Sequence, residues 1–151
     1  MTEIKSTTGR YIDAGGVNHP AHYNTDKSGV ECIEITRHMD FNLGNAFKYI
    51  FRAGQKVDAK NGENEDLVEY FRVESEIKDL SKAIWYLKDE RKNVKALDPR
   101  LYPRHFYEDK IAKVIASREG NIQQAMIMLD QGYFEMAVSA IEAEIKRIKE
   151  V

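Results

Sequence analysis

Two pairs of acidic residues stand at helical spacing in the sequence. Glu31 and Glu34 are three residues apart, and so are Glu76 and Asp79, so each pair would project from one face of a helix. If the two helices pack as antiparallel neighbours, the four carboxylates could converge on Mg²⁺, a hard cation that prefers carboxylate and phosphate oxygens. The same spacing also arises on charged helix surfaces. A magnesium site and a solvated face are therefore both open interpretations.

Basic residues recur at every fourth position between the two acidic pairs. They are Lys48, Arg52 and Lys56, and the last of them follows Gly54, which is expected to end the helix. A phosphate-bearing ligand needs such cations, because Arg can grip two oxygens at once and Lys supplies a mobile point charge. The stripe indicates phosphate binding, and the alternative is a surface stripe paired with glutamates.

A carboxylate, an ammonium group and a phenol share a second strip. Asp79, Lys82 and Tyr86 follow one another at steps of three and four residues, which places them on one side of a helix. An internal ion pair is the simpler explanation of the two charges. Trp85 and Tyr86 could stack on a nucleobase, although aromatic residues at helical spacing commonly belong to the core.

Two histidines and a tyrosine lie around a proline near the start of the chain. His19, His22 and Tyr23 surround Pro20, which disfavours a helical conformation at the residue before it and indicates a rigid loop. These side chains could hold one edge of a ligand. No cysteine lies beside them to support zinc binding, and the pair of histidines could equally be structural.

Helices with apolar stripes are expected to position these side chains. The spacing predicts helices over residues 31–39, 42–53 and 66–93, with Asn42 as the cap of the second and a bend or break near Ser75 in the third. Shorter helices are predicted over 106–117, 121–131 and 133–149, after a two-proline linker over 98–103. The expected fold is an all-α helical bundle. It comprises a flexible arm over 1–16, a helical domain over 17–97 and a C-terminal helical extension over 98–151 that builds a homo-oligomer.

The composition limits the partners and the compartment. The 23 basic and 25 acidic residues leave a net charge of -2, which gives no overall field for a nucleic-acid polymer. No apolar run approaches the roughly 20 residues that cross a bilayer, and the first residues lack an apolar signal segment. A single cysteine, Cys32, excludes an internal disulfide and favours a reducing compartment. We therefore expect a cytoplasmic protein that binds neither membranes nor polymeric nucleic acid.

Several common catalytic motifs are absent from the sequence. There is no Gly-x-x-x-x-Gly-Lys-Ser/Thr loop and no Gly-x-Gly-x-x-Gly fingerprint, which excludes a standard P-loop kinase and a dinucleotide-binding enzyme. There is also no Gly-x-Ser-x-Gly elbow. Nucleophilic hydrolysis therefore has little support.

Four motifs in a fixed order resemble one bacteriophage family. They are His19-Pro20-x-His22-Tyr23, Gly29-Val30-Glu31-Cys32-Ile33-Glu34, Gly44-Asn45-Ala46-Phe47-Lys48-Tyr49-Ile50-x-Arg52-Ala53-Gly54-x-Lys56 and Asp79-Leu80-x-Lys82-Ala83-x-Trp85-Tyr86-Leu87. This order resembles the phage nucleotide-kinase-like proteins of domain-of-unknown-function family 3310. The resemblance implies a kinase that lacks a P-loop and acts on deoxynucleoside monophosphates. The family's recurring positions would be His19, His22, Tyr23, Glu31, Lys48, Arg52, Lys56, Asp79, Lys82 and Tyr86.

A weaker likeness is to the all-helical nucleotide pyrophosphohydrolases of the MazG type. In that family a Glu-x-x-Glu pair and a Glu-x-x-Asp pair bind magnesium, and Glu31-x-x-Glu34 and Glu76-x-x-Asp79 fit this pattern. The interval between the pairs is longer here, with residues 56–75 as an apparent insertion. The likeness implies a shared type of helical fold rather than a shared activity.

Three functions follow as hypotheses. In the first, a phosphotransferase uses Mg²⁺ and a nucleoside triphosphate donor, with Lys48, Arg52 and Lys82 neutralising the phosphates and Glu31, Glu34, Glu76 and Asp79 holding the metal. In the second, the same metal activates water to cleave a nucleoside triphosphate. In the third, the chain sequesters a nucleotide signal without turnover, which would blunt a host defence.

Overall fold

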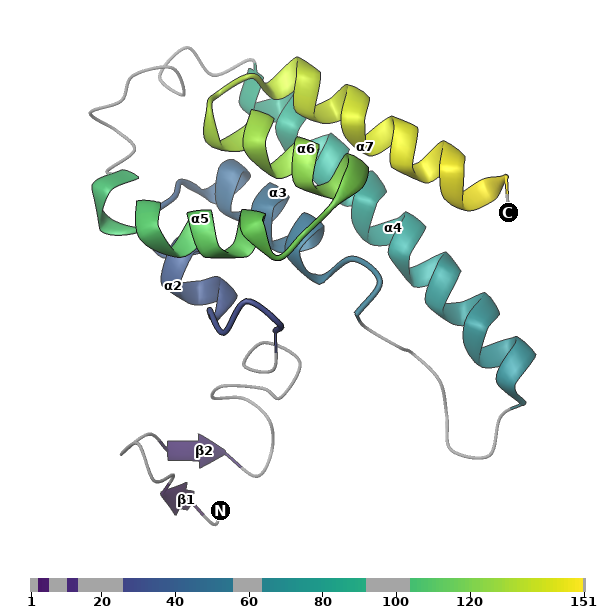
Figure 1. The fold of residues 1–151 in the computed structure, drawn as a ribbon, viewed down its shortest axis with the longest axis horizontal. Coiled ribbons are helices and arrows are strands. Elements are labelled where there is room, and N and C mark those ends of the chain that lie inside the picture. The colour runs from purple at the N-terminus through teal and green to yellow at the C-terminus, as the bar shows by residue number, and fades with distance from the viewer. Residues whose placement is uncertain (1–2, 6–10, 14–25, 56–63, 92–103, 151) are drawn as a thin grey trace.

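The computed structural model describes residues 3–5, 11–13, 26–55, 64–91 and 104–150. The described residues form an all-α body with a small two-stranded ribbon at its start (Figure 1). The helices are α2 (Cys32–Thr36), α3 (Phe41–Arg52), α4 (Glu65–Arg91), α5 (Glu108–Ala116), α6 (Gly120–Asp130) and α7 (Phe134–Lys149), and a short 3₁₀ helix, η3, covers Arg104–Phe106. The all-α fold class predicted from the sequence is confirmed.

The ribbon lies within the predicted N-terminal arm. Strands β1 (Glu3–Lys5) and β2 (Tyr11–Asp13) pair antiparallel, with Glu3 opposite Asp13. The sequence did not predict them, because a three-residue strand is too short to show an alternating pattern.

The N-cap of helix α3 lies two residues before the predicted one. Asp40 is the N-cap residue, and its carboxylate accepts a hydrogen bond from the backbone N–H of Leu43 at 2.8 Å. The expectation that Asn42 caps the helix is wrong, because Asn42 lies in the first turn and its side chain bonds to α4. At the other end the backbone of Gly54 has a φ of 80°, a conformation that glycine adopts without strain. The predicted end of the helix is confirmed.

Helix α4 runs for 27 residues from Glu65 to Arg91. It continues through Ser75, so the helix does not break there. Despite this length, no helix in the part of the chain that the structure describes is apolar enough to span a membrane.

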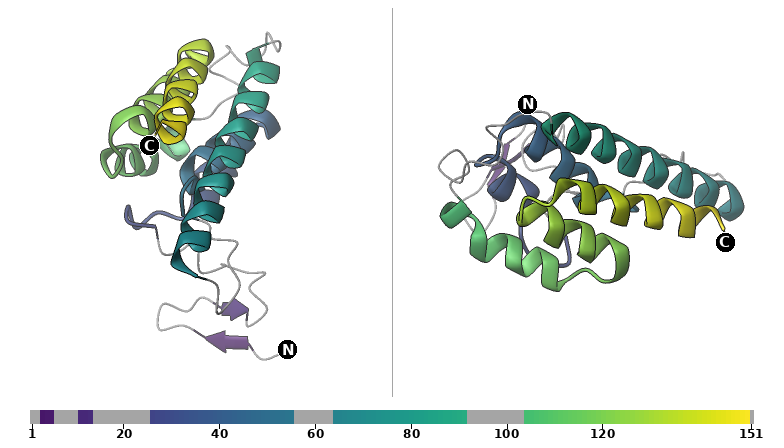
Figure 2. Two further views of the ribbon diagram at one scale, coloured as in Figure 1. Left: turned by 90° about the vertical axis from the view of Figure 1, so that its right-hand side faces the viewer. Right: turned by 90° about the horizontal axis from the view of Figure 1, so that it is seen from above.

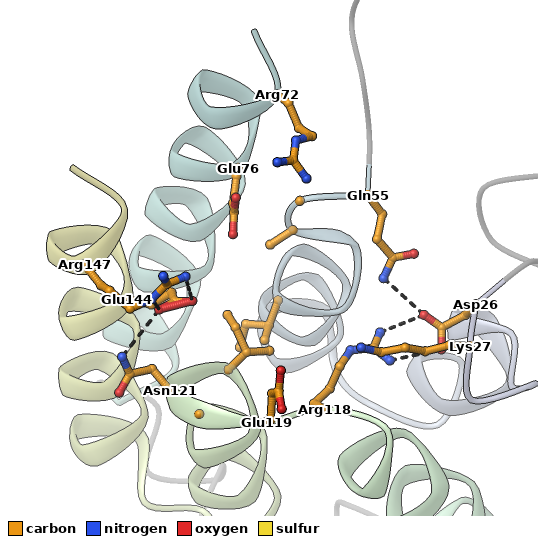
Figure 3. A pocket seen from close by; sticks show the side chains of 15 residues that line it. Asp26, Lys27, Gln55, Arg72, Glu76, Arg118, Glu119, Asn121, Glu144 and Arg147 are labelled. Carbon is orange, nitrogen blue, oxygen red and sulfur yellow. Dashed lines mark hydrogen bonds and ion pairs between the residues drawn. The ribbon is translucent and has the colours of Figure 1, made fainter. Parts of the chain in front are cut away.

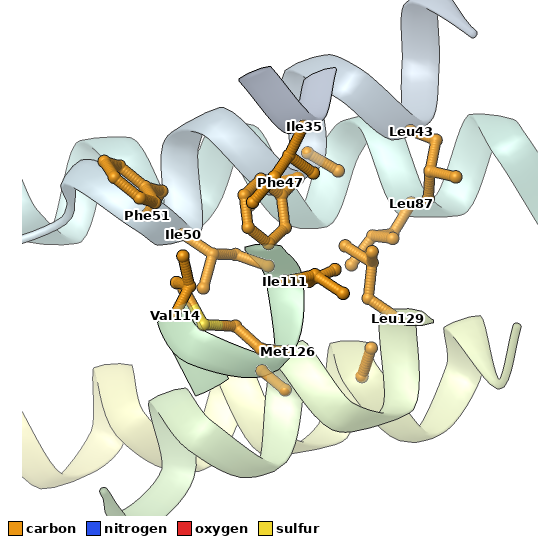
Figure 4. Close-up of a cluster of buried hydrophobic side chains, with 14 of the residues drawn as sticks. Ile35, Leu43, Phe47, Ile50, Phe51, Leu87, Ile111, Val114, Met126 and Leu129 are labelled. Atoms are coloured by element: carbon orange, nitrogen blue, oxygen red, sulfur yellow. The ribbon is translucent and has the colours of Figure 1, made fainter. Parts of the chain in front are cut away.

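The helices form two layers with the core between them. Helix α3 lies beside α4, while α6 and α7 form a hairpin whose α7 lies along α4 (Figures 1 and 2). Buried side chains from both layers meet in one cluster, drawn in Figure 4, to which Phe47, Ile50, Leu87, Val114 and Met126 contribute. The short C-terminal helices thus bury their apolar faces against the main body, as expected of helices too short to be stable alone.

Candidate functional site

Three basic side chains meet at the ring of Tyr49. The Nζ atoms of Lys48 and Lys82 lie 4.7 and 5.2 Å from the ring centroid, and the Cζ atom of Arg52 lies 4.8 Å from it. All three distances are within the roughly 6 Å range of cation–π attraction. Because Lys82 comes from α4 and the others from α3, helix packing brings together the two strips singled out in the sequence. We call these four residues the cation–tyrosine cluster.

A buried carboxylate lies against this cluster. Arg52 Nη2 donates a hydrogen bond to Asp79 Oδ1 at 3.1 Å, and only 5% of the Asp79 side chain is exposed. The other oxygen, Asp79 Oδ2, is buried and has no hydrogen-bond partner among the described residues. A buried acceptor without a hydrogen bond lowers the stability of the folded protein.

The cations of the cluster repel one another. The pKa of Lys48 lies below its ordinary value, because the ammonium group is partly buried and because the charges of Arg52 and Lys82 oppose it. The nearby charge of Asp79 acts in the other direction but does not restore the ordinary pKa. An anion bound here would offset this repulsion.

Aromatic rings extend the cluster toward solvent. Tyr86 stacks on Tyr49 with ring centroids 6.0 Å apart, and Phe41 and Trp85 approach Tyr86 edge-on at 5.8 and 5.1 Å. Phe41 is 74% exposed and Trp85 is 62% exposed, so Trp85 does not belong to the core. The sequence did not single out Phe41. Its position could have been predicted, because Lys48 and Arg52 follow Phe41 by seven and eleven residues and therefore lie on the same helix face.

The four carboxylates proposed as magnesium ligands do not form one group. Among the described residues, no three His, Cys, Asp or Glu side chains gather closely enough to hold a metal ion. Glu31 and Glu34 instead cap α2, where each side chain accepts a backbone N–H, and Asp79 binds Arg52. The structure therefore does not gather the four carboxylates, because helical spacing sets the face of a residue but not its partner.

Glu76, the remaining member of the predicted set, faces a separate cavity (Figure 3). This open cavity of about 960 Å³ lies between the end of α3, helix α4, the start of α6 and α7. Glu144 of α7 also lines it and accepts hydrogen bonds from Arg147 and Asn121. Burial, followed by the charge of Glu144, raises the pKa of Glu76.

Removing the charge of Glu76 should stabilise the protein at neutral pH. Since its pKa is raised in the folded state, the folded protein binds the proton more tightly, and stability falls as pH rises through that pKa. Glu76→Gln should therefore raise Tm at neutral pH by a few degrees at most and flatten the dependence of Tm on pH. Thermal unfolding between mildly acidic and neutral pH measures this. Glu119→Gln, at an exposed position of the same cavity, is the control, and a lower Tm for Glu76→Gln would contradict the assignment.

A buried ion pair that the sequence did not reveal closes another wall of the cavity. Arg118 donates to both oxygens of Asp26 at 2.7 and 3.1 Å and to the carbonyl of Phe51 at 3.0 Å. Burial would raise the pKa of Asp26, but hydrogen bonds from Arg118 and Ser28 hold it below its ordinary value. These charges satisfy one another, so this wall has a structural role. No local spacing pattern relates residues so far apart.

The remaining sequence candidates divide into two groups. Cys32 is buried as predicted, and burial raises the pKa of its thiol to about 12, which makes it a poor nucleophile. His19, His22, Tyr23 and Lys56 lie outside the described residues, as does the linker predicted over 98–103.

A family model described as a protein of unknown function, DUF3310, matches residues 17–69. This chain is similar to that family over about a third of its length. No curated protein and no solved structure matches the chain. The matched segment contains the α3 side of the cluster, with Lys48 and Arg52, and ends before Asp79 and Lys82. The family description names no activity.

Proposed function

We propose that this chain binds a phosphorylated nucleotide at the cation–tyrosine cluster and transfers a phosphoryl group to a nucleoside monophosphate. The observation that supports this most is the convergence of Lys48, Arg52 and Lys82 on the single ring of Tyr49. Three like charges held together by helix packing repel one another, and phosphate oxygens would offset that repulsion with charge-assisted hydrogen bonds. Surface lysines that only keep a protein soluble are not expected to gather at one aromatic side chain.

The cluster suits phosphoryl transfer because that reaction needs positioning and charge stabilisation more than a covalent nucleophile. Lys48 and Arg52 would hold the phosphates from α3, and Lys82 would hold them from α4. A nucleoside triphosphate would serve as the donor. The described carboxylates do not provide a dedicated magnesium site, so Mg²⁺ would reach the cluster with the phosphates of the ligand.

The two other functions differ in what they require. Metal-assisted hydrolysis of a nucleoside triphosphate needs a group of carboxylates that positions the ion, and the described residues do not form one. Sequestration of a nucleotide needs only the cluster. Binding without turnover is therefore the main competing outcome.

Separating these functions requires one set of incubations of the full chain in buffer containing Mg²⁺. A nucleoside triphosphate and a deoxynucleoside monophosphate are supplied together and singly, and the products are resolved by anion-exchange chromatography. The proposal predicts two diphosphates only when both nucleotides are present. Pyrophosphate from the triphosphate alone would indicate the hydrolase, and retention of nucleotide without any product would indicate sequestration.

As pH rises, the affinity for nucleotides should begin to fall at a lower pH than it would if Lys48 had the pKa of an ordinary lysine. Since the pKa of Lys48 is lowered, its ammonium group loses the proton, and with it the attraction for phosphate, at lower pH than a free lysine. Titrations above about pH 7.5, where the phosphate is already fully charged, measure this. Lys48→Arg keeps its charge at every pH tested and should flatten the profile. Identical profiles for the two proteins would exclude Lys48 from the site.

We also propose that the chain forms a homo-oligomer and that, as a phage protein, it acts in the cytoplasm of the host. The phage origin is proposed from the resemblance, and the oligomer from apolar side chains left at the surface. On α7 and the residue before it, Tyr133 and Met136 are exposed, and they offer a surface for a second copy.

A further inference from the structure

Two exposed aromatic side chains, Phe41 and Trp85, lie beside the cation–tyrosine cluster. Phe41 is the first residue of α3, and Trp85 lies far along α4, so they come from different helices and yet both make T-shaped contacts with Tyr86. Tyr86 in turn stacks on Tyr49, the ring that carries the three cations. The order in space is thus cations, two stacked tyrosines, and then two exposed aromatic side chains.

We infer that the nucleobase of the ligand stacks on Phe41 and Trp85, and that the site therefore accepts nucleotides of different bases. The inference rests on the proposed function for the phosphate end of the ligand. A nucleotide carries its base and its phosphate on one sugar, and here the exposed rings connect to the cations through the two stacked tyrosines, Tyr86 and Tyr49. Stacking of a base on an aromatic side chain contributes about 1–3 kcal/mol, and every base offers a flat face.

Tolerance of different bases follows from the polar groups near these rings. Asn42, next to Phe41, donates from Nδ2 to Asp89 Oδ2 at 2.8 Å, and Asp89 stands one turn beyond Trp85 on α4. The amide and the carboxylate are thus bonded to one another rather than directed at the edge of a base. Recognition through hydrogen bonds to base edges discriminates strongly, whereas stacking discriminates weakly. Purines should bind somewhat more tightly than pyrimidines because their faces are larger.

The intrinsic fluorescence of the full chain tests this directly, because Trp85 is its one tryptophan. The titrants are the four deoxynucleoside monophosphates, ribose 5-phosphate and inorganic phosphate. All four nucleotides should quench the emission, with dissociation constants within about tenfold of one another. Ribose 5-phosphate should bind about tenfold or more weakly than the nucleotides and quench little.

Calorimetry on variants separates the contribution of the base to the affinity from that of the phosphate. Trp85→Leu and Phe41→Leu should each weaken nucleotide binding by about tenfold and leave the binding of inorganic phosphate unchanged. Tyr70→Leu removes an aromatic ring that is also exposed on α4 but belongs to its first turns, and it should have no effect.

Each outcome supports or contradicts the inference. Three results would overturn the stacking site while leaving phosphate binding at the cluster intact. They are nucleotide binding without quenching, equal affinity of both variants and the wild type, and dissociation constants that differ by more than about a hundredfold between bases. If neither nucleotides nor inorganic phosphate bind, the proposed function itself fails, and the inference fails with it.

Discussion

Replacing Arg52 by alanine is expected to weaken nucleotide binding by about a hundredfold, measured by isothermal titration calorimetry with a deoxynucleoside monophosphate. Arg52 contacts both the aromatic ring and the buried carboxylate of the site, because its guanidinium group lies over the ring of Tyr49 and donates to Asp79. The substitution removes a charge-assisted hydrogen bond to the ligand. It also leaves the Asp79 carboxylate without this cation beside the incoming phosphate, so repulsion adds to the loss.

Two further variants define the origin of this effect. Arg37→Ala removes an exposed arginine at the end of α2 whose Nε donates to the backbone carbonyl of Ile33 in the same segment, and affinity should not change. Arg52→Lys keeps the charge but loses the fork that grips two oxygens, so it should bind with intermediate affinity. Folding of each variant is checked by its Tm. Affinity of the wild-type level in a folded Arg52→Ala protein would exclude the cluster as the phosphate site.

Replacing Arg118 by methionine should lower the free energy of unfolding by about 3–5 kcal/mol. This side chain is 6% exposed and joins the α5–α6 connection to Asp26 and to the end of α3. Its loss leaves the carboxylate of Asp26 buried without its partner, and an unpaired buried charge costs far more than a broken surface pair. Urea unfolding followed by circular dichroism measures the change.

The matched control for this substitution is Arg72→Met. Arg72 also makes a two-bond contact, with Glu69 at 2.7 and 3.0 Å, but the two side chains are 44% and 58% exposed. Water and ions screen such a pair, so the midpoint of urea unfolding should hardly change. The double variant Asp26→Asn with Arg118→Met should recover part of the stability. Equal losses for the two arginines would show that burial does not determine the strength of the Asp26 pair.

The helical body could be predicted from the sequence because apolar periodicity persists wherever a helix covers the core. The segment predicted as 42–53 is α3 at Phe41–Arg52, and that predicted as 133–149 is α7 at Phe134–Lys149. The basic strip of α3 and the mixed strip of α4 were also visible, since both follow helical spacing. Their meeting at Arg52 and Asp79 could be proposed on the condition that the helices are neighbours.

Other features depend on contacts that spacing does not encode. Asp26 and Arg118 are 92 residues apart, and nothing local in the sequence indicates that they pair. Glu31 and Glu34 satisfy the spacing of a metal-binding pair, yet local backbone N–H groups compete for the same oxygens and take them as helix caps. Tyr49 lies beside the predicted strip, but only the packed helices place three cations around its ring.

The most direct test of the account is a crystal structure of the full chain grown with a deoxynucleoside monophosphate. The account predicts that the phosphate lies within hydrogen-bond distance of Lys48, Arg52 and Lys82. A nucleotide bound with its phosphate elsewhere, for example in the cavity beside Glu76, with these three side chains still gathered around Tyr49, would contradict it.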